Sequence, residues 1–421
     1  MNYRTSVLEQ DCHLSWNAVY SKGYEVAVIR SIKQVPAIWD DLAPAHDIFL
    51  QRPYLQVLEN NPPDGMGFCY LIYRKEGKPI GIAACQIQHF NVDKSLKLKE
   101  KENEGSPCFF TVLGRYLKGL VASKVEFTTF VCGNILLTGE HAYHFTADTI
   151  PAPKAFELVD HSMDVAKGIL NAEGSTINGY LLKDFFDQTR NNTFSKAHTN
   201  LNEFTIEPNM VLNMDPNWKS FDDYLASLSS KYRVRTRKAF KTAAPLQIQT
   251  FDEQKIYTHR HELYKLYKSV AENSGFNIIN LNIDYLYALK KQFKDDFTLT
   301  AYLLDGEIIA FYTTILNGEE LEAHFLGFDQ EICRRYKVYL NILYDIIKIG
   351  IEKQVSKIVY ARTALEIKST VGAQPYEMYC YMRHANAFSN KFVSPLLEYL
   401  KPDHNGWIPR QPFKDREKYK Y

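Results

Sequence analysis

The sequence has no membrane-spanning run and almost no net charge. A membrane-spanning helix needs about 20 consecutive apolar residues, and no stretch of the 421 residues approaches that length. The opening residues, MNYRTSVLEQDCHLSW, lack the basic start and apolar run of a signal peptide. We therefore expect a cytoplasmic chain. The 50 basic and 49 acidic residues give a formal charge of +1, so no general attraction to DNA or to an anionic membrane is expected.

Cysteine is also sparse, and its spacing fits neither a metal site nor a disulfide framework. The number of cysteines is odd, and no two stand at CxxC or another metal-ligand spacing. We expect reduced and mostly buried thiols, and neither a metal ion nor a tightly bound cofactor. The seven residues are Cys12, Cys69, Cys85, Cys108, Cys132, Cys333 and Cys380.

The length of the chain and its aromatic content indicate the number of domains and the kind of core. A chain of 421 residues is too long for one ordinary core and suits two domains of about 200 residues each. Aromatic residues make up 14% of the sequence. This content suits large cores or a cleft with flat apolar walls, but it identifies no ligand.

The first half of the chain predicts strands on both sides of a long helix. Apolar runs, turn residues and helical spacing mark the individual elements. A charged and amphipathic insertion at 91–125 interrupts them. The expected elements are a strand at 25–32, a helix at 38–42, a hairpin of 68–73 and 79–90, a strand at 127–137, a helix at 156–170 and a strand at 176–182.

The second half repeats that order with stronger turn signals. Asp305-Gly306 and Asn317-Gly318 are two-residue hairpin turns, and they predict a three-stranded meander. A long amphipathic helix and a strand that returns beside the meander follow it. The expected elements are strands at 209–214, 297–304, 307–315, 320–327, 356–360 and 376–383, with helices at 221–241 and 339–353.

The repeated order predicts a duplicated α/β (α+β) architecture. Each half is expected to form a mixed, mostly antiparallel sheet flanked by helices. The polar stretch after Gln188 has no apolar pattern, which favours a boundary there. We therefore expect an N-terminal domain at 1–195, which contains the insertion, and a C-terminal domain at 196–421 with a basic tail.

Two segments of the second half resemble a known family. Ala361–Lys368 with Val371–Pro375 resembles a segment near the end of tandem GNAT proteins of the Fem-like, peptidoglycan-aminoacyltransferase-related group. Ser230–Ala239 resembles the Lys/Arg helix of those proteins. The resemblance covers roughly residues 25–385. It implies two GNAT-like domains, in which a central strand splays from its neighbour and the donor lies in the gap.

The resemblance also implies an acyl-transfer activity. Members transfer an acyl or aminoacyl group to an amine, from acyl-CoA, acyl-carrier protein or aminoacyl-tRNA. We favour an N-acyltransferase similar to bacterial ceramide synthases, which acylates an amino lipid of sphingoid type. Two alternatives stay open: a Fem-like transferase that uses aminoacyl-tRNA on a cell-wall precursor, and a non-catalytic ligand-binding protein.

The loop that holds the donor pyrophosphate in GNAT proteins departs from the family pattern. That loop is glycine-rich, and its amides bind the phosphates at a helix N-terminus. Here the segment Gly327–Lys337 has Gly327 as its one glycine, and it carries Asp329 and Glu331, which oppose an anion. Arg334, Arg335 and Lys337 could compensate. The donor and the half that binds it therefore stay open.

Glu322 and His324 are the candidate catalytic residues. Both lie on the strand Leu321–Phe325, and the period of two places them on one face, with Ala323 and Phe325 on the other. Acylation requires the amine to lose a proton, and a His with a pKa near the working pH is suited to accept it. The alternative is a Glu and a His on a partly solvated sheet face.

The residues of the family-like segments are candidates for binding the donor. Arg362, Thr363 and Lys368 would hold a phosphate or carboxylate, together with Tyr232 and Arg233 of the basic helix. Glu366 and Gly372 are expected to brace the turn or position a substrate. The basic run from Lys231 to Lys241 covers more than one helical face, so a solvated surface remains an alternative to an anionic partner.

Two further features carry weaker expectations. His141 and His144 follow Gly139 and Glu140 in a loop, and ordinary hydrogen-bonding roles or substrate positioning are favoured over metal binding, because no third ligand is near. The apolar residues of the insertion suit an ordinary packed helix, an acyl-chain wall, or a peripheral contact with the inner face of the membrane.

Overall fold

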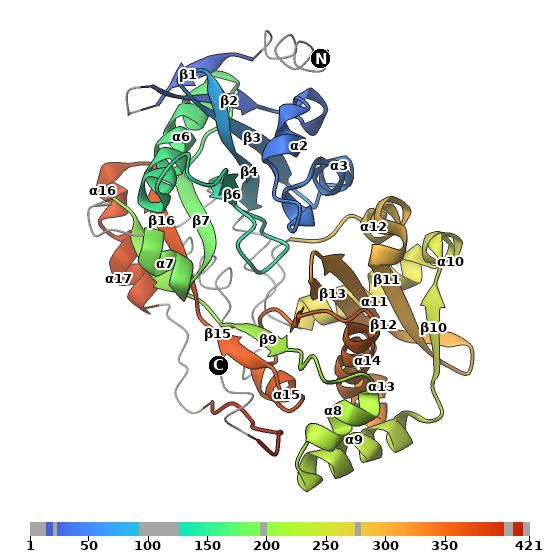
Figure 1. The fold of residues 1–421 in the computed structure, drawn as a ribbon. Helices are drawn as coiled ribbons and strands as arrows, with labels where there is room; N and C mark the ends of the chain where they lie inside the picture. Colours follow the sequence, from blue (N-terminus) through green and yellow to red (C-terminus); the bar gives the residue numbers. More distant parts are fainter. Residues whose placement is uncertain are drawn as a thin grey trace, which may run out of the picture. The chain divides into compact units, whose positions relative to one another are not determined.

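The computed structural model describes residues 14–19, 23–91, 126–193, 200–273, 279–399 and 407–415 (Figure 1). It consists of two compact units. Unit 1 is Met1–Ile206 with Met378–Pro402, and unit 2 is Glu207–Glu377 with Asp403–Tyr421. The amphipathic part of the insertion, Cys12 and Cys108 lie outside the described residues. The other five cysteines are free and buried, which agrees with the expected reduced thiols.

Unit 1 is built on a mixed sheet. Glu76 and Gly77 adopt positive φ angles of 50° and 77° at the turn of its first hairpin, as a tight two-residue connection requires. All neighbouring strands are antiparallel except β5 and β7, which are parallel. The strands, in sheet order, are β1 (Trp16–Ala18), β2 (Tyr24–Ile29), β3 (Met66–Lys75), β4 (Lys78–Asn91), β5 (Glu126–Cys132), β7 (Gly179–Phe186), β16 (Met378–His384) and β8 (Asn202–Thr205), with β6 (Tyr143–Phe145) beside β4.

Helices cover both faces of this sheet. Helix α6 (Ala152–Ala172) presents apolar residues at helical spacing to a cluster that contains Leu71 of β3. Successive side chains of a strand point to opposite faces, and the neighbouring Tyr70 meets α2 (Ile38–Leu42) instead. Its ring packs edge-on against Trp39 with centroids 5.8 Å apart. The core of unit 1 therefore has two layers of side chains around the sheet.

The last strand of the chain belongs to unit 1, which differs from the boundary expected at 195/196. Strand β15 (Gln374–Tyr376) pairs with β9 in unit 2. Strand β16 follows it directly, yet it pairs with β7 and β8 of unit 1. Unit 1 also extends to Ile206. Apolar alternation marks a strand without naming the sheet edge that accepts it, so the sequence could not place β16.

Unit 2 repeats the architecture. Its meander turns at Asp305-Gly306 and at Gly318, where positive φ angles confirm the expected hairpins. Only β13 and β14 are parallel. The strands, in sheet order, are β10 (Gln247–Phe251), β11 (Phe297–Leu304), β12 (Glu307–Asn317), β13 (Glu320–Phe328), β14 (Lys357–Val359), β9 (Asn209–Asn213) and β15.

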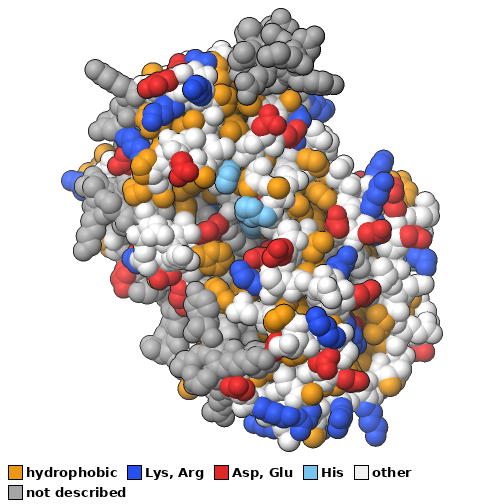
Figure 2. All heavy atoms as spheres, viewed as in Figure 1, with side chains coloured by type: hydrophobic (Ala, Val, Ile, Leu, Met, Phe, Trp, Pro, Cys, Tyr) orange, Lys and Arg blue, Asp and Glu red, His pale blue; other side chains and the backbone are white. Residues whose placement is uncertain are grey.

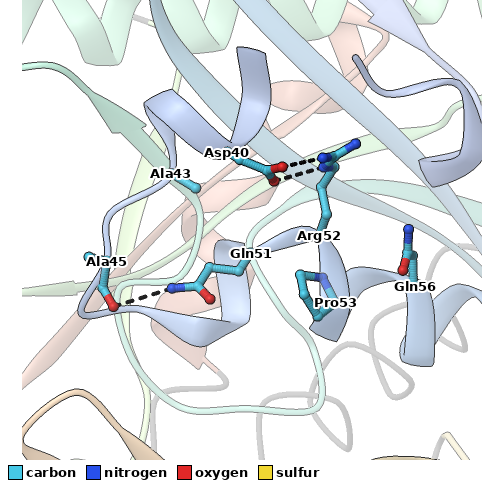
Figure 3. A pocket seen from close by; sticks show the side chains of 7 residues that line it. All are labelled: Asp40, Ala43, Ala45, Gln51, Arg52, Pro53 and Gln56. Atoms are coloured by element: carbon cyan, nitrogen blue, oxygen red, sulfur yellow. Dashed lines mark hydrogen bonds and ion pairs between the residues drawn. The ribbon is translucent and has the colours of Figure 1, made fainter. Parts of the chain in front are cut away.

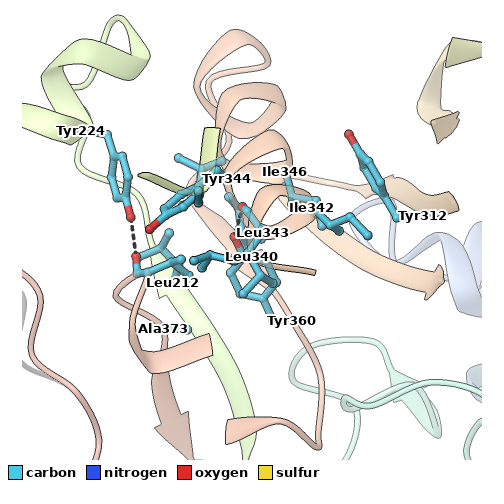
Figure 4. Close-up of a cluster of buried hydrophobic side chains, with 14 of the residues drawn as sticks. Leu212, Tyr224, Tyr312, Leu340, Ile342, Leu343, Tyr344, Ile346, Tyr360 and Ala373 are labelled. Carbon is cyan, nitrogen blue, oxygen red and sulfur yellow. Dashed lines mark hydrogen bonds between the residues drawn. The ribbon is translucent and has the colours of Figure 1, made fainter. Parts of the chain in front are cut away.

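Buried tyrosines are prominent in the core of unit 2 (Figure 4). Tyr224, Tyr344 and Tyr360 lie among the apolar side chains of α14. Their hydroxyls find partners: Tyr360 donates to the carbonyl of Leu343 and Tyr224 to that of Val371, each at 2.9 Å, which offsets the cost of burial. The helices of this unit include α8 (Phe221–Ser227), α9 (Ser230–Ala243), α10 (Glu253–Thr258), α11 (Arg260–Asn273), α12 (Tyr285–Phe293), α13 (Gln330–Tyr336), α14 (Val338–Glu352) and α15 (Leu365–Ser369).

One expected helix, 221–241, is two helices. Leu228 is extended, with ψ of 148°, and it forms a β-bridge with Phe413. Ser229 then precedes α9 as its N-cap residue. Helical periodicity continues across the break, which explains the single helix that the sequence predicts. Apart from such local differences, two mixed sheets flanked by helices confirm the expected fold class.

Candidate functional site

The parallel strands of unit 2 separate after three residue pairs. Strand β14 pairs with β13 from Glu320↔Lys357 to Glu322↔Val359, and the chain then enters a turn in which Ala361 has a φ of 57°. Strand β13 continues to Phe328. Among the described residues, this continuation pairs only with β12, so its other edge presents backbone groups that no strand satisfies.

A β-bulge lies within this continuation. Tyr312 pairs with Leu326 and Thr314 with Ala323, so His324 and Phe325 together oppose Thr313. The Thr313 hydroxyl accepts from the Phe325 N–H at 2.8 Å and donates to its carbonyl at 3.1 Å. The expectation that Phe325 faces away from His324 is therefore wrong, because the extra residue interrupts the alternation. Both rings pack against Tyr285 of α12.

His324 is enclosed by aromatic rings. The rings of Tyr285, Phe297 and Phe325 have centroids within 6.3 Å of it. Its Nε2 lies 3.5 Å from the Tyr285 hydroxyl, and its buried Nδ1 has no hydrogen-bond partner among the described residues. This burial lowers the pKa of His324 to about 3. The expected pKa near the working pH is thus contradicted. Glu322 is buried where the strands separate.

The low pKa of His324, which aromatic rings enclose, predicts a pH-dependent stability. The ordinary pKa of 6.5 applies to the unfolded chain, whereas the folded imidazole stays neutral down to about pH 3. Protons therefore favour unfolding as the pH falls below 6.5. Relative to His324→Gln, the wild-type chain should lose up to about 1.4 kcal/mol per pH unit in that window. Urea denaturation at pH 7.5, 6.0 and 5.0 measures this, with the exposed His261→Gln as control. Parallel pH profiles for wild type and His324→Gln would contradict it.

The family-like turn after β14 brings three predicted donor ligands together. Lys368 is buried, and its Nζ donates to the carbonyls of Ala361 (3.1 Å) and Arg362 (2.6 Å). Arg362 Nε donates to the carbonyl of Glu207 at 2.9 Å, and the Thr363 N–H donates to the Glu207 carboxylate at 3.2 Å. No motif in the sequence marks Glu207 as part of this turn. These bonds hold a turn in which three residues have positive φ, a conformation that needs such support.

The electrostatics of this turn centre on Lys368. Burial lowers its pKa to about 7, and the carboxylate of Glu207 opposes that shift. Glu366, which the sequence places in the same turn, pairs with Arg410 at the surface. Gly372 has a φ of 102°, and a Cβ there would lie 2.4 Å from the Phe413 ring. The described part of the tail thus packs onto this turn.

Helix α9 separates a buried face from a basic face. Tyr232, Thr236 and Ala239 are buried, and Arg233 binds the Leu228 carbonyl and the Ser230 hydroxyl. The helix contains no acidic residue, and Lys and Arg side chains gather where it lies (Figure 2). None of its exposed cations forms an ion pair with a described residue. They occupy the side opposite the buried face: Lys231, Arg235, Arg237, Lys238 and Lys241.

The connection after β13 does not offer free amides to a pyrophosphate. Asp329 is the N-cap of α13, and its Oδ1 accepts from the N–H groups of Glu331 (3.0 Å) and Ile332 (2.9 Å). These are the groups that bind phosphate at a helix N-terminus. An internal carboxylate therefore fills this role, which agrees with the departure of the sequence from the family loop.

The parallel strands of unit 1 also separate, and a loop takes the vacated edge. Strands β5 and β7 pair from Thr129↔Gly179 to Cys132↔Leu182. Beyond them, the N–H of Phe186 donates to Glu140 Oε1 at 2.7 Å, and the N–H of Gly139 donates to Asp184 Oδ2 at 3.2 Å. Lys183 reaches the Leu137 carbonyl at 2.7 Å. The loop 133–142 is thus fixed to β7 by side-chain bonds.

His141 and His144 have different surroundings. His141 is buried, with its Nδ1 2.9 Å from Asp47 Oδ2 and its ring edge-on to Phe49. His144 lies on β6 and is half-buried. Burial and the neighbouring His46 lower its pKa. Within the described ranges, no group of three His, Cys, Asp or Glu side chains is arranged to hold a metal ion.

The described residues of unit 1 line two pockets that bear on ligand binding. The first, of about 200 Å³, lies beside the loop 133–142, and His46, Asp47, Glu140, His144, Asp184 and Thr189 are among its lining residues. The second, of about 480 Å³, is an open hollow that Asp40, Gln51 and Arg52 help to line (Figure 3). There Arg52 and Asp40 form a two-pronged ion pair with each other, so the hollow lacks a free charged group to bind a ligand.

Two mixed α/β units, each with a parallel strand pair that separates, agree with the fold that the resemblance to tandem GNAT proteins implies. The sequence matches no family model and no curated protein, and within the described segments no helix is long and apolar enough to cross a membrane. Solved structures show weak similarity. FemX shares 11% identity (TM-score 0.45; 80% of this chain and 97% of that chain). A tandem GNAT protein of the clavulanic acid biosynthesis pathway shares 8% (0.43; 80% and 88%). The C-terminal domain of a putative lysylphosphatidylglycerol synthetase from Agrobacterium fabrum shares 10% (0.40; 67% and 84%).

Proposed function

We propose that this chain is an N-acyltransferase that moves an acyl group from a thioester donor to an amine. The observation that carries the proposal is the edge of β13 from Ala323 to Phe328, which no described strand covers. An extended donor arm that contains amide groups is suited to pair with such an edge, as an added strand does. The edge begins beside the buried carboxylate of Glu322.

The proposed reaction forms a C–N bond and breaks a C–S bond. The amine nitrogen attacks the thioester carbon, a base accepts the proton of the amine, and the thiolate leaves. Backbone N–H groups of the β13 edge would stabilise the oxygen as it gains charge. Glu322 is the proposed base, because the low pKa of His324 leaves its imidazole with little affinity for a proton.

The proposed donor is an acyl-carrier protein, with acyl-CoA as the alternative. Asp329 occupies the amides that would hold a CoA pyrophosphate, whereas α9 exposes five cations without an acidic neighbour on the helix. Such a surface complements an acidic protein and speeds its association. The same cations favour a second candidate, a Fem-like transfer from aminoacyl-tRNA, because phosphates are equally complementary to them.

The proposed acceptor is an amino lipid of sphingoid type, reached by peripheral contact with the membrane. The purified chain is incubated with sphinganine and, in parallel, with palmitoyl-carrier protein, palmitoyl-CoA or a mixture of aminoacyl-tRNAs, and the products are identified by mass spectrometry. We expect a long-chain amide with the carrier protein. An aminoacyl product would favour the Fem-like reaction, and the absence of an amide with every donor would exclude acyl transfer to this amine.

Reversing charges on α9 tests the donor surface. The double variant Arg235→Glu/Lys238→Glu should lower kcat/KM for the carrier-protein donor by about tenfold at low salt, mainly through association. The matched control, Lys265→Glu/Lys291→Glu, makes the same charge change elsewhere in unit 2 and should leave kcat/KM nearly unchanged. Equal losses in both variants would show that total charge, and not α9, governs donor binding.

A further inference from the structure

The smaller pocket of unit 1 is lined by groups that form a specific chemical environment. His46 and Asp47 reach it from the segment before β3, whereas Glu140 and His144 reach it from the loop after β5 and from β6. Histidine side chains come to the surface on this face of the molecule (Figure 2). Its volume of about 200 Å³ is below the range of about 300–1,000 Å³ for drug-sized ligands. It therefore suits a small head group.

Two of the three carboxylates in the pocket lie within hydrogen-bond distance of a basic side chain. Asp184 is bound by Lys183, by the Gly139 N–H and by the Cys380 thiol. Asp47 accepts from the Phe49 N–H at 3.0 Å and lies 2.9 Å from His141 Nδ1. The positive charge of Lys183 offsets the negative charge of Asp184, so this ion pair adds no net charge to the pocket.

Glu140 differs from the other two carboxylates. Its Oε1 accepts from the Phe186 N–H at 2.7 Å, and Thr189 supplies a further hydrogen bond. No Lys or Arg among the described residues forms an ion pair with it. Burial raises the pKa of Glu140, and only the adjacent His141 and these hydrogen bonds oppose that shift. A half-buried carboxylate without a cationic partner is less stable than a paired one, and a bound cation would supply that partner.

The remaining lining residues also suit a cation that donates hydrogen bonds. The ring nitrogens of His46 and His144 form no hydrogen bond with any described residue, and burial favours the neutral, accepting form of His144. The rings of Tyr143 and Phe185, with centroids 6.1 Å apart, supply an apolar wall whose faces attract positive charge. A primary ammonium group is complementary to all of these groups. It has three hydrogen-bond donors for the acceptors, and one positive charge for the carboxylate and the aromatic faces.

We propose that this pocket binds a primary ammonium group, with Glu140 as its counter-ion and with His46 and His144 as hydrogen-bond acceptors. Binding of this group does not depend on the proposed function. Because its volume is small, the pocket has room for the amine and its nearest substituents. A long chain would extend beyond it.

Binding of 2-amino-1,3-propanediol to the full chain tests the pocket without any donor. Glycerol is the matched ligand, because a hydroxyl replaces the amine in a molecule of the same shape. Titration calorimetry or ligand-observed NMR should show at least tenfold weaker binding of glycerol. Glu140→Gln, which can still accept from the Phe186 N–H, and His144→Asn should each weaken binding of the amine by about tenfold. Asp64→Asn, an exposed carboxamide replacement in unit 1, should not.

The outcomes separate this proposal from the proposed activity. Equal binding of the amine and of glycerol, or undiminished binding by both pocket variants, would overturn the pocket assignment even if amide synthesis is observed. Absence of all amide synthesis would refute only the proposed function and would leave the pocket assignment unchanged.

Discussion

Replacing Asp184 by Asn is expected to lower the free energy of unfolding of unit 1 by about 3–5 kcal/mol. Asp184 is fully buried and Lys183 is 5% exposed, and the two side chains form an ion pair. Removing one charge leaves the other buried without its partner. Asp184 has a φ of 63°, a conformation that Asn tolerates, so the substitution changes the charge and leaves the backbone unstrained. Hydrogen exchange read by mass spectrometry reports the stability of this unit.

A matched control and a double variant separate charge from backbone effects. Asp148 is exposed and has a φ of 62°, so Asp148→Asn repeats the same change at the same backbone angle and should alter stability by less than about 0.5 kcal/mol. Lys183→Met/Asp184→Asn removes both charges and should be less destabilised than the sum of the single variants. Strict additivity would show that the pair contributes no coupling energy.

Most of the fold was predictable because its signals are local. The turns at Asp305-Gly306 and at Gly318 form hairpins through residues with positive φ, and the apolar spacing of α6 and α14 marks helices that cover a sheet. The strand β16 was predicted as a strand but placed in the wrong sheet. Its partner strand β7 is distant in the sequence: Cys380 and Asp184, which are in contact, are 196 residues apart. No local pattern encodes such a pairing.

The candidate sites were predictable only in part. The sequence named His324, Arg362 and Lys368, and the structure places the last two in one turn. The sequence does not reveal the bulge opposite Thr313, because two residues that face one partner leave no compositional signal. The sequence also does not show which side chains share a pocket with Glu140 and His144. His46 comes from a segment that carries no motif, and a pocket between distant segments becomes visible only in three dimensions.

Gly327, near the end of β13, leads to the second large prediction. Gly327→Ala should destabilise unit 2 by about 3 kcal/mol or more, the upper part of the range for overpacking. A Cβ at this position would lie 2.4 Å from the backbone nitrogen of Tyr267 and 2.5 Å from the backbone carbon of Leu266. Both atoms belong to α11, so rotating a side chain cannot relieve the overlap, and the helix itself has to move. Chemical denaturation measures the loss.

Two other glycines provide a graded comparison. At Gly350 a Cβ would meet the end of the Ile358 side chain at 2.8 Å, which can rotate away, so Gly350→Ala should cost less. At Gly168, within α6, nothing lies within 4 Å, and alanine should stabilise the helix by about 0.5–1 kcal/mol. If Gly327→Ala were as harmless as Gly168→Ala, α11 would not lie directly on β13. The expected order of the three stability effects would show that Gly327 is needed for the close packing of α11 on β13. A glycine kept for phosphate binding would instead be required by a ligand, and its replacement would reduce donor affinity without this loss of stability.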